Sequence, residues 1–284
     1  MMSDALSPQP TTPAAPAGPA APLASAASGA RIIAVTSGKG GVGKTFVSAN
    51  LAAALTRRGQ RVLVLDADLG LANLDVVLNL YPKVTLHDVF TGRSTLEEAI
   101  LPAPGGYSVL LAGSGMIEYS RLTPEIRQQF THTIETLAPR YDIVLLDTGA
   151  GISDVVLFSV SMATEVLVIA TPEPTSLTDA YAAIKVLAIQ QKRQQIRLAI
   201  NQAARPGDGR AITGQLQQVL NRFVSTASGE PLRLTHLGDI PSDPAVREAV
   251  MRRQLLLQSM PGAPASLAVA QLANKIKALL VSGG

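Results

Sequence analysis

From residue 31 onward, short apolar runs alternate with longer segments in which apolar positions recur at helical spacing. The short runs are rich in β-branched residues and mostly apolar on both faces, which is typical of strands buried on both sides of a sheet. They lie at Ile32–Val35, Val62–Leu65, Val109–Leu111, Ile143–Leu146, Val166–Ala170, Leu198–Ile200 and Leu232–Leu237. The longer segments include Phe46–Arg57, Thr123–Leu137, Thr178–Gln190 and Ile212–Val224.

This alternation predicts an α/β protein with a mainly parallel, twisted sheet and helices on both faces. No Asn-Gly or Asp-Gly pair joins two strand runs, and no internal repeat is evident. Residues 1–30 differ, since they contain ten alanines and six prolines and can form no periodic apolar face. We therefore expect a disordered Pro/Ala-rich tail over residues 1–30 and a single folded domain over residues 31–284.

Composition excludes several functional classes. The absence of cysteine removes disulfides, thiolate zinc sites, cysteine nucleophiles and iron–sulfur clusters. No apolar run is long enough to span a membrane, and no secretion signal begins the chain, so we expect a cytoplasmic protein. Residues 1–180 carry 11 basic and 16 acidic residues, whereas residues 181–284 carry 13 and 5. We interpret this basic excess as a solvated face because its residues are scattered; an acidic protein, nucleic acid or anionic lipid partner is the alternative.

A glycine-rich segment follows the first predicted strand and opens the first predicted helix. It fits G-x-x-x-x-G-K-[ST], with Gly38, Gly43, Lys44 and Thr45 in register. Glycines allow backbone N–H groups to turn toward a phosphate, and the helix N-terminus adds its positive dipole end. Lys44 supplies charge to the β- and γ-phosphates, and the Thr45 hydroxyl is placed to ligate Mg²⁺. The segment predicts a P-loop NTPase fold that binds ATP and Mg²⁺ through Gly38, Gly40, Gly41, Val42, Gly43, Lys44, Thr45 and Phe46.

Aspartates follow two of the predicted strands. Asp66 and Asp68 share one face by the two-residue period of a strand, at the carboxyl end where ligands of parallel sheets bind. One carboxylate near Mg²⁺ and one near the attacking water suit phosphate hydrolysis; the alternative is that the pair caps a following turn. Asp147 follows four apolar residues, which is the pattern of a Walker B carboxylate that holds Mg²⁺.

An additional lysine, Lys39, is not needed to hold the phosphates of its own chain, and its position suits neutralising charge across an interface. The segment 38–45 resembles the deviant Walker A box of the MinD/ParA ATPases, and the resemblance extends over nearly all of residues 31–284. It implies an ATP-dependent homodimer in which Lys39 reaches the partner's phosphates. It also implies that Asp68 positions the attacking water while Asp66 lies near the metal, so Lys39, Lys44 and Asp68 are the expected catalytic residues.

The resemblance extends to the adenine side and also shows a departure. Asn201, Pro241 and Asp243 are similar to the family's adenine-contacting positions, although a turn role for Pro-Ser-Asp-Pro stays open. Phe46 stands where many relatives carry a small polar residue able to touch the α-phosphate. We expect nucleotide binding to survive on backbone contacts with an altered affinity, so that Phe46→Thr changes the affinity measured by calorimetric titration.

Three motifs favour one branch of the family. The segments 66–75, 147–153 and 238–243 are most similar to the flagellar-number regulators, the FlhG or FleN group. That resemblance implies regulation of flagellar number through a partner, which is a flagellar GTPase, a switch-complex protein or a σ⁵⁴-type activator. A DNA-binding partition ATPase of the ParA type and a division-site ATPase of the MinD type remain the alternatives; we do not expect nucleic acid as a partner.

The last segment with helical spacing bears on the membrane alternative. We interpret its apolar stripe as the last core helix, with at most weak peripheral contact at the inner face of the membrane. Shallow insertion into a membrane surface, helped by neighbouring Lys275 and Lys277, is the other interpretation. The stripe consists of Leu267, Leu272, Ile276, Leu279 and Leu280.

Overall fold

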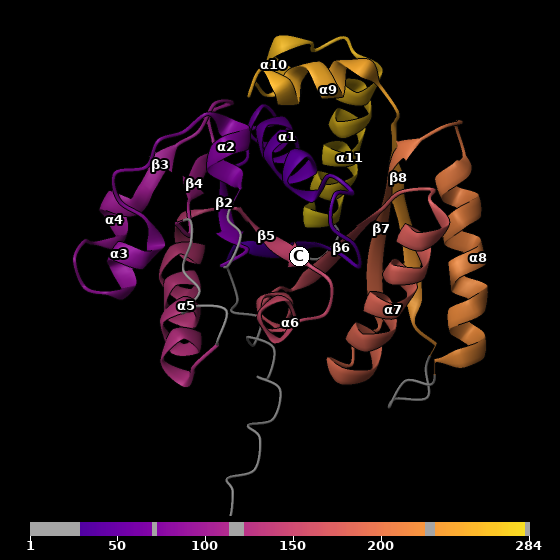
Figure 1. Ribbon diagram of the computed structural model, residues 1–284, viewed down its shortest axis with the longest axis horizontal. Coiled ribbons are helices and arrows are strands. Elements are labelled where there is room, and N and C mark those ends of the chain that lie inside the picture. The colour runs from indigo at the N-terminus through magenta and orange to yellow at the C-terminus, as the bar shows by residue number, and fades with distance from the viewer. Residues whose placement is uncertain (1–28, 70–72, 114–121, 225–230, 282–284) are drawn as a thin grey trace, which may run out of the picture.

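A computed structural model describes residues 29–69, 73–113, 122–224 and 231–281. Within these ranges one eight-stranded sheet lies between two layers of helices (Figure 1). The predicted tail lies outside the described residues up to position 28, as do residues 70–72 of the first acidic motif. The strands are β1 (Arg31–Ser37), β2 (Val62–Ala67), β3 (Ile100–Pro102), β4 (Ser108–Leu110), β5 (Ile143–Ala150), β6 (Glu165–Ala170), β7 (Gln195–Ala203) and β8 (Arg233–Pro241).

The strands are arranged in the order β3-β4-β2-β5-β1-β6-β7-β8, and every neighbouring pair except β3–β4 is parallel. This confirms the predicted α/β fold and all seven predicted strands. The additional strand β3 runs antiparallel to β4 at the sheet edge. It has only three residues and ends in proline, so it is too short to show the alternation by which a strand is recognised.

Helices cover both faces of the sheet. On one face α1, α2, α10 and α11 enclose a hydrophobic cluster that includes Leu51 and Val269, and on the other α5–α8 enclose a cluster around Phe130 and Ile184. The helices are α1 (Lys44–Thr56), α2 (Leu74–Leu78), α3 (Leu86–Phe90), α4 (Leu96–Ala99), α5 (Pro124–Leu137), the 3₁₀ turn η2 (Ala138–Arg140), α6 (Asp154–Ser161), α7 (Pro174–Gln190), α8 (Asp208–Phe223), α9 (Pro244–Met251), α10 (Leu256–Ser259) and α11 (Pro264–Val281).

Helix α11 is a core helix, as predicted. Leu272 and Ile276 are buried against the sheet and α1, whereas Leu267 at the start of the helix is exposed. Lys275 Nζ donates to the Leu237 carbonyl at 2.6 Å, and Lys277 Nζ donates to the Arg58 carbonyl at 2.8 Å. Both lysines thus bind the backbone of their own domain. The side chain of Leu280, the last member of the stripe, lies outside the described part.

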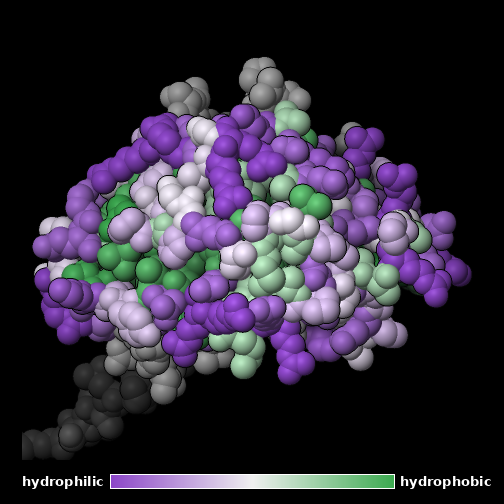
Figure 2. All heavy atoms as spheres, turned by 90° about the horizontal axis from the view of Figure 1, so that it is seen from above, coloured by the Kyte–Doolittle hydropathy of each residue, from purple (hydrophilic) through white to green (hydrophobic). Residues whose placement is uncertain are grey.

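Most of the surface seen from above is hydrophilic, and the hydrophobic residues there gather toward the side on which α2–α4 lie (Figures 1 and 2). Val76 in α2 and Tyr81 just after it are among the exposed large apolar side chains of the described residues. No helix in the described ranges combines the length and the apolar character needed to cross a bilayer.

Candidate nucleotide-binding site

The phosphate loop joins the buried strand β1 to helix α1. Gly41 and Gly43 have φ angles of 78° and 92°, in the left-handed region that glycine adopts without strain. A side chain at Gly38 would collide with the backbone carbonyl of Asp179 in α7, so the loop packs directly on that helix. Helix α1 begins after Gly43 without a side-chain cap. Its first N–H groups are therefore available to an anion, as a phosphate site requires.

Strand register brings the predicted acidic residues next to this loop. Asp147 in β5 lies opposite Val35 of β1 on one side and opposite Asp66 of β2 on the other. Asp68 lies two residues after Asp66, and its backbone N–H donates to Asp66 Oδ1 at 3.2 Å. The Asp68 carboxyl carbon lies 3.3 Å from where a side chain on Gly149 would begin. The structure thus brings all three predicted aspartates to the carboxyl edge of the sheet, beside Lys44.

The charged side chains of this site are buried, and burial shifts their pKa values. Burial raises the pKa of Asp66 well above its usual range, and the neighbouring Asp147 adds to the shift. Burial also raises the pKa of Asp147 to about 6, although the hydroxyls of Thr45 and Ser48 and the charge of Lys44 act to lower it. Burial lowers the pKa of Lys44, and the negative charges of Asp147 and Asp68 partly offset this shift. A divalent cation here would favour the ionised carboxylates, so its binding releases protons.

The donor set fits Mg²⁺. Asp66 is 1% exposed, and its Oδ2 atom has no hydrogen-bond partner among the described residues. The Thr45 hydroxyl lies near the Asp147 carboxylate and acts to lower the pKa of that group. In the described part of the chain, no three acidic or histidine side chains converge as a complete metal cage. Mg²⁺ needs none, because it keeps several waters and takes the remaining ligands from substrate phosphates.

Ser48 is a site residue that the motifs did not predict. It lies four residues after Lys44 on α1, is fully buried, and donates from Oγ to Asp147 Oδ1 at 2.8 Å. The bond orients the carboxylate and stabilises its ionised form. The sequence signal for Ser48 is its spacing of one helical turn from Lys44. That spacing does not reveal its partner, because Asp147 is 99 residues away.

We expect Ser48→Ala to weaken Mg²⁺ affinity by about tenfold, because groups that orient metal ligands contribute roughly 10–100-fold. The measurement is the Mg²⁺ concentration that half-saturates ATP hydrolysis. Ser159→Ala is the matched control, since Ser159 is equally buried but bonds to its own helix at Val155. An unchanged half-saturating concentration in Ser48→Ala would contradict this role.

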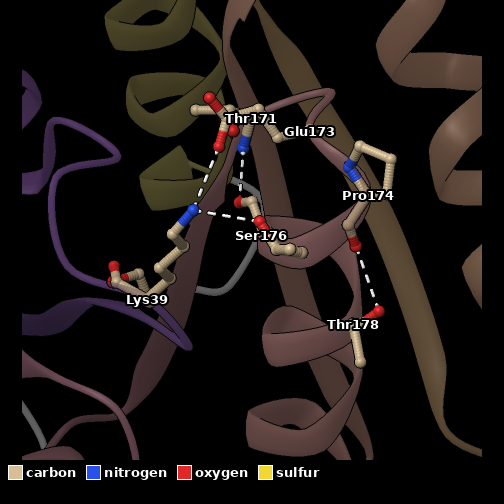
Figure 3. A network of polar contacts seen from close by, with 8 residues as sticks. Lys39, Thr171, Glu173, Pro174, Ser176 and Thr178 are labelled. Carbon is tan, nitrogen blue, oxygen red and sulfur yellow. Dashed lines mark hydrogen bonds and ion pairs between the residues drawn. The ribbon is translucent and has the colours of Figure 1, made fainter.

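Lys39 is held within its own chain. Its Nζ donates to Glu173 Oε2 at 3.1 Å and to Thr175 Oγ1 at 3.0 Å, both at the start of α7. Figure 3 shows the lysine reaching across to this segment, beside the bond from the Thr171 N–H to Ser176 Oγ. The ion pair is exposed, so it contributes little to stability and can be broken readily. Sequence patterns gave no indication of this pairing.

The predicted adenine-side residues lie in two places. Asn201, at the carboxyl end of β7, is buried and bonds to Val42 of the phosphate loop. Pro241 ends β8, and Asp243 caps α9 by accepting from the Ala245 N–H at 2.9 Å. Asp243 also accepts from the Ala265 N–H at 3.0 Å, so the turn role left open for this loop is present. Base contact by these three residues stays a prediction.

Phe46, the predicted departure, points away from solvent. Its side chain is 6% exposed and packs in the hydrophobic cluster between α1 and the sheet. The aromatic ring therefore has a packing role, and a threonine at this position would lose that contact as well as gain a hydroxyl. The altered nucleotide affinity stays a prediction, and calorimetric titration of Phe46→Thr with nucleotide measures it.

A glycine-rich loop joins a buried strand to a helix and ends in a buried lysine followed by a threonine, and a carboxylate lies on the adjacent strand. This combination defines a P-loop NTPase. Comparison with known proteins agrees. The ParA family model, described as "NUBPL iron-transfer P-loop NTPase", matches residues 29–277. The chain belongs to the MinD/ParA family of P-loop ATPases. The iron transfer in that description is not assigned to this chain, which has no cysteine.

Curated relatives cover nearly the same length. The antiactivator FleN of Pseudomonas aeruginosa is 43% identical over 246 residues, which is 87% of this chain and 86% of that protein. The flagellum site-determining protein YlxH of Helicobacter pylori is 32% identical over 255 residues, 89% of this chain and 84% of that protein. The sequence is therefore FleN-like and FlhG-like within the family.

Solved structures share the fold. The cell division ATPase MinD of Pyrococcus furiosus superposes with a TM-score of 0.73 at 30% identity, over 88% of this chain and 99% of that one. The septum site-determining protein MinD of Pyrococcus horikoshii, complexed with Mg-ADP, gives a TM-score of 0.72 at 28% identity, over 89% and 98%. The predicted P-loop NTPase fold is thereby confirmed.

Proposed function

We propose that this protein is an ATP-dependent dimerising switch that regulates flagellar number or placement through a partner protein. The observation that carries the proposal is the 43% identity to the antiactivator FleN over nearly the whole folded part of the chain. The similarity to YlxH, a flagellum site-determining protein, also supports a flagellar role. The phosphate loop with its additional Lys39 supplies the chemistry of the switch.

In this proposal the nucleotide site works as follows. The loop N–H groups and Lys44 bind the β- and γ-phosphates, and Thr45 and Asp147, with Asp66 nearby, hold Mg²⁺. When bound, Mg²⁺ neutralises charge on the phosphates. The Asp68 carboxylate orients the water that attacks the γ-phosphorus, and the products are ADP and phosphate. Ser48 keeps the Asp147 carboxylate aligned and ionised.

Lys39 supplies the dimerising step. In the single chain its ammonium group is paired with Glu173 and Thr175. In the dimer it leaves these partners and reaches the triphosphate bound by the other protomer. The phosphates carry far more negative charge than one glutamate, so the exchange is favourable only when ATP is present. ATP shifts the monomer–dimer balance because Lys39 binds differently in the two states.

The dimer then recruits a partner, and hydrolysis releases it. The word antiactivator in the description of FleN favours a transcriptional activator among the three partner classes that we consider, the other two being a flagellar GTPase and a switch-complex protein. We propose that the protein acts in the cytoplasm, with at most weak peripheral contact at the inner membrane face. Lys275 and Lys277 bind backbone carbonyls of their own domain, which supports this placement.

The test combines the purified protein with a σ⁵⁴-type flagellar activator and measures complex formation by light scattering. We expect a complex with a non-hydrolysable ATP analogue and a loss of that complex with ADP. Salt-sensitive, ATP-dependent retention on non-specific DNA would favour the partition alternative instead. Sedimentation with anionic liposomes in ATP, lost when residues 275–284 are removed, would favour the division-site alternative.

A further inference from the structure

Ser37 is the last residue of β1, lies directly before the phosphate loop and is fully buried. Its side-chain hydroxyl donates from Oγ to the backbone carbonyl of Lys39 at 2.7 Å. Buried hydroxyls are nearly always hydrogen-bonded, and a serine can bond the backbone a short way along its own chain. Here the acceptor is the main chain of the additional lysine, so this bond holds the backbone of Lys39 from inside the domain.

The end of strand β5 holds Ser37 in turn. The backbone carbonyl of Ser37 accepts from the Gly151 N–H at 2.8 Å. The register of the two strands shifts at this point, because the β1 segment 35–37 lies opposite the longer β5 segment 147–150. A register irregularity of this kind changes the direction in which nearby side chains point. Ser37 therefore has an anchored backbone from which its hydroxyl reaches the loop.

The side chain and the backbone of Lys39 are held differently. The ammonium group is bound to Glu173 and Thr175, and its ion pair with Glu173 is exposed and readily broken. The backbone carbonyl is bound by the hydroxyl of a buried residue instead, and a hydrogen bond is electrostatically stronger inside a protein than in water. When the ammonium group leaves Glu173, the backbone of Lys39 thus keeps its place, and the side chain turns about a fixed point.

We propose that Ser37 is a positioning residue that fixes the backbone of Lys39, so that the ammonium group reaches the phosphates bound by the other protomer. The inference rests on the proposed function, because that function gives Lys39 its role across the dimer. A serine that acts through Lys39 serves the nucleotide site of the other protomer. A serine that only keeps its own phosphate loop folded would serve the site of its own chain.

Ser37→Ala is expected to lower ATP turnover by about tenfold, the effect of losing one buried hydrogen bond. The ATP affinity of the single chain, measured by calorimetry, should stay nearly unchanged, because Lys44 and the loop N–H groups remain. Ser161→Ala is the matched control, since Ser161 is also buried and its Oγ donates to the Phe158 carbonyl at 2.7 Å, at the C-terminal end of α6. We expect the control to hydrolyse ATP at the unaltered rate.

Mixing two variants tests which site Ser37 serves. Asp68→Asn loses the carboxylate that acts on water in its own site, but its Ser37 and Lys39 are intact. In a mixed dimer, the Ser37→Ala chain keeps its own Asp68 and receives a correctly held lysine from the Asp68→Asn chain. We therefore expect the mixture, combined in ADP before ATP is added, to hydrolyse ATP faster than either variant alone.

Lys39→Ala mixed with Asp68→Asn is the reference, for which we expect the same gain. A gain for Lys39→Ala without one for Ser37→Ala would overturn the positioning role alone, as would a loss of single-chain ATP affinity as large as the loss of turnover. No gain in either mixture would refute the role of Lys39 across the dimer, and the proposed switch with it. Ser37→Cys keeps a weaker donor and replaces Ser37→Ala in the mixture, with the same expected gain, if the alanine variant does not fold.

Discussion

Replacing Asp68 by asparagine is expected to lower the rate of ATP hydrolysis by about 10²–10⁴-fold while leaving ATP binding nearly intact, in line with the contribution of a positioned acid–base group. The Asp68 carboxyl lies against Gly149 of β5, and its charge acts on Lys44 of the phosphate loop. A neutral amide of the same shape keeps this packing and loses the negative charge that orients water in the proposed mechanism. The binding elements around the phosphates are unaltered.

Because the variant binds ATP but does not consume it, its dimer should persist. Light scattering in ATP should give the mass of two chains for Asp68→Asn long after the unaltered protein has returned to single chains. Glu135→Gln, on the exposed side of α5, removes one charge elsewhere and should hydrolyse ATP normally. Hydrolysis by Asp68→Asn within tenfold of the unaltered rate would remove Asp68 from the proposed mechanism.

Lys39→Ala is expected to abolish ATP-driven dimerisation and to lower hydrolysis by about 10³-fold, comparable to the smallest losses when a cationic finger supplied in trans is removed. ATP binding to the single chain should persist, because Lys44 and the loop N–H groups remain. The structure supports this separation, since Lys39 is bound to the start of α7 and Lys44 is buried at the base of the loop. Lys192→Ala, at the opposite end of the sheet before β7, is the control.

A second variant tests whether Lys39 exchanges Glu173 for the triphosphate of the other protomer. Glu173→Gln keeps the length of the side chain but removes the charge that pairs with Lys39 in the single chain. Since an exposed ion pair contributes up to about 1 kcal/mol, dimerisation should require up to about fivefold less ATP. Dimerisation and turnover of Lys39→Ala at the unaltered level would disprove the trans role, whatever Glu173→Gln does.

Much of the fold could be predicted because its signals are local. The central parallel strands β1, β2, β5 and β6 each contain a continuous apolar run, and the phosphate loop lies between such a run and a helix. Strand β3 could not be predicted in the same way, since its three residues are recognised only by their pairing with β4. The predicted aspartates came together because the carboxyl ends of parallel strands meet at one edge.

The support around those residues was not predictable from local patterns. Ser48 bonds to Asp147, Lys39 to Glu173 and Asn201 to Val42, and each pair is separated by 99 residues or more. A motif records residue types at short spacing and contains no information on which distant side chain approaches it. Phe46 illustrates the same limit, because its packing in the core depends on the direction in which α1 leaves the loop.

The amino-acid sequence by itself determined the class of protein and predicted its nucleotide and its reactive groups, since the motifs that indicate them depend on short-range order along the chain. The tertiary structure alone decided how those groups are held: which carboxylate accepts a bond from a serine, where the additional lysine lies in a single chain, and which amide bonds to the phosphate loop. The physical reason is that hydrogen-bond geometry arises only when the sheet brings distant strands and helices into contact.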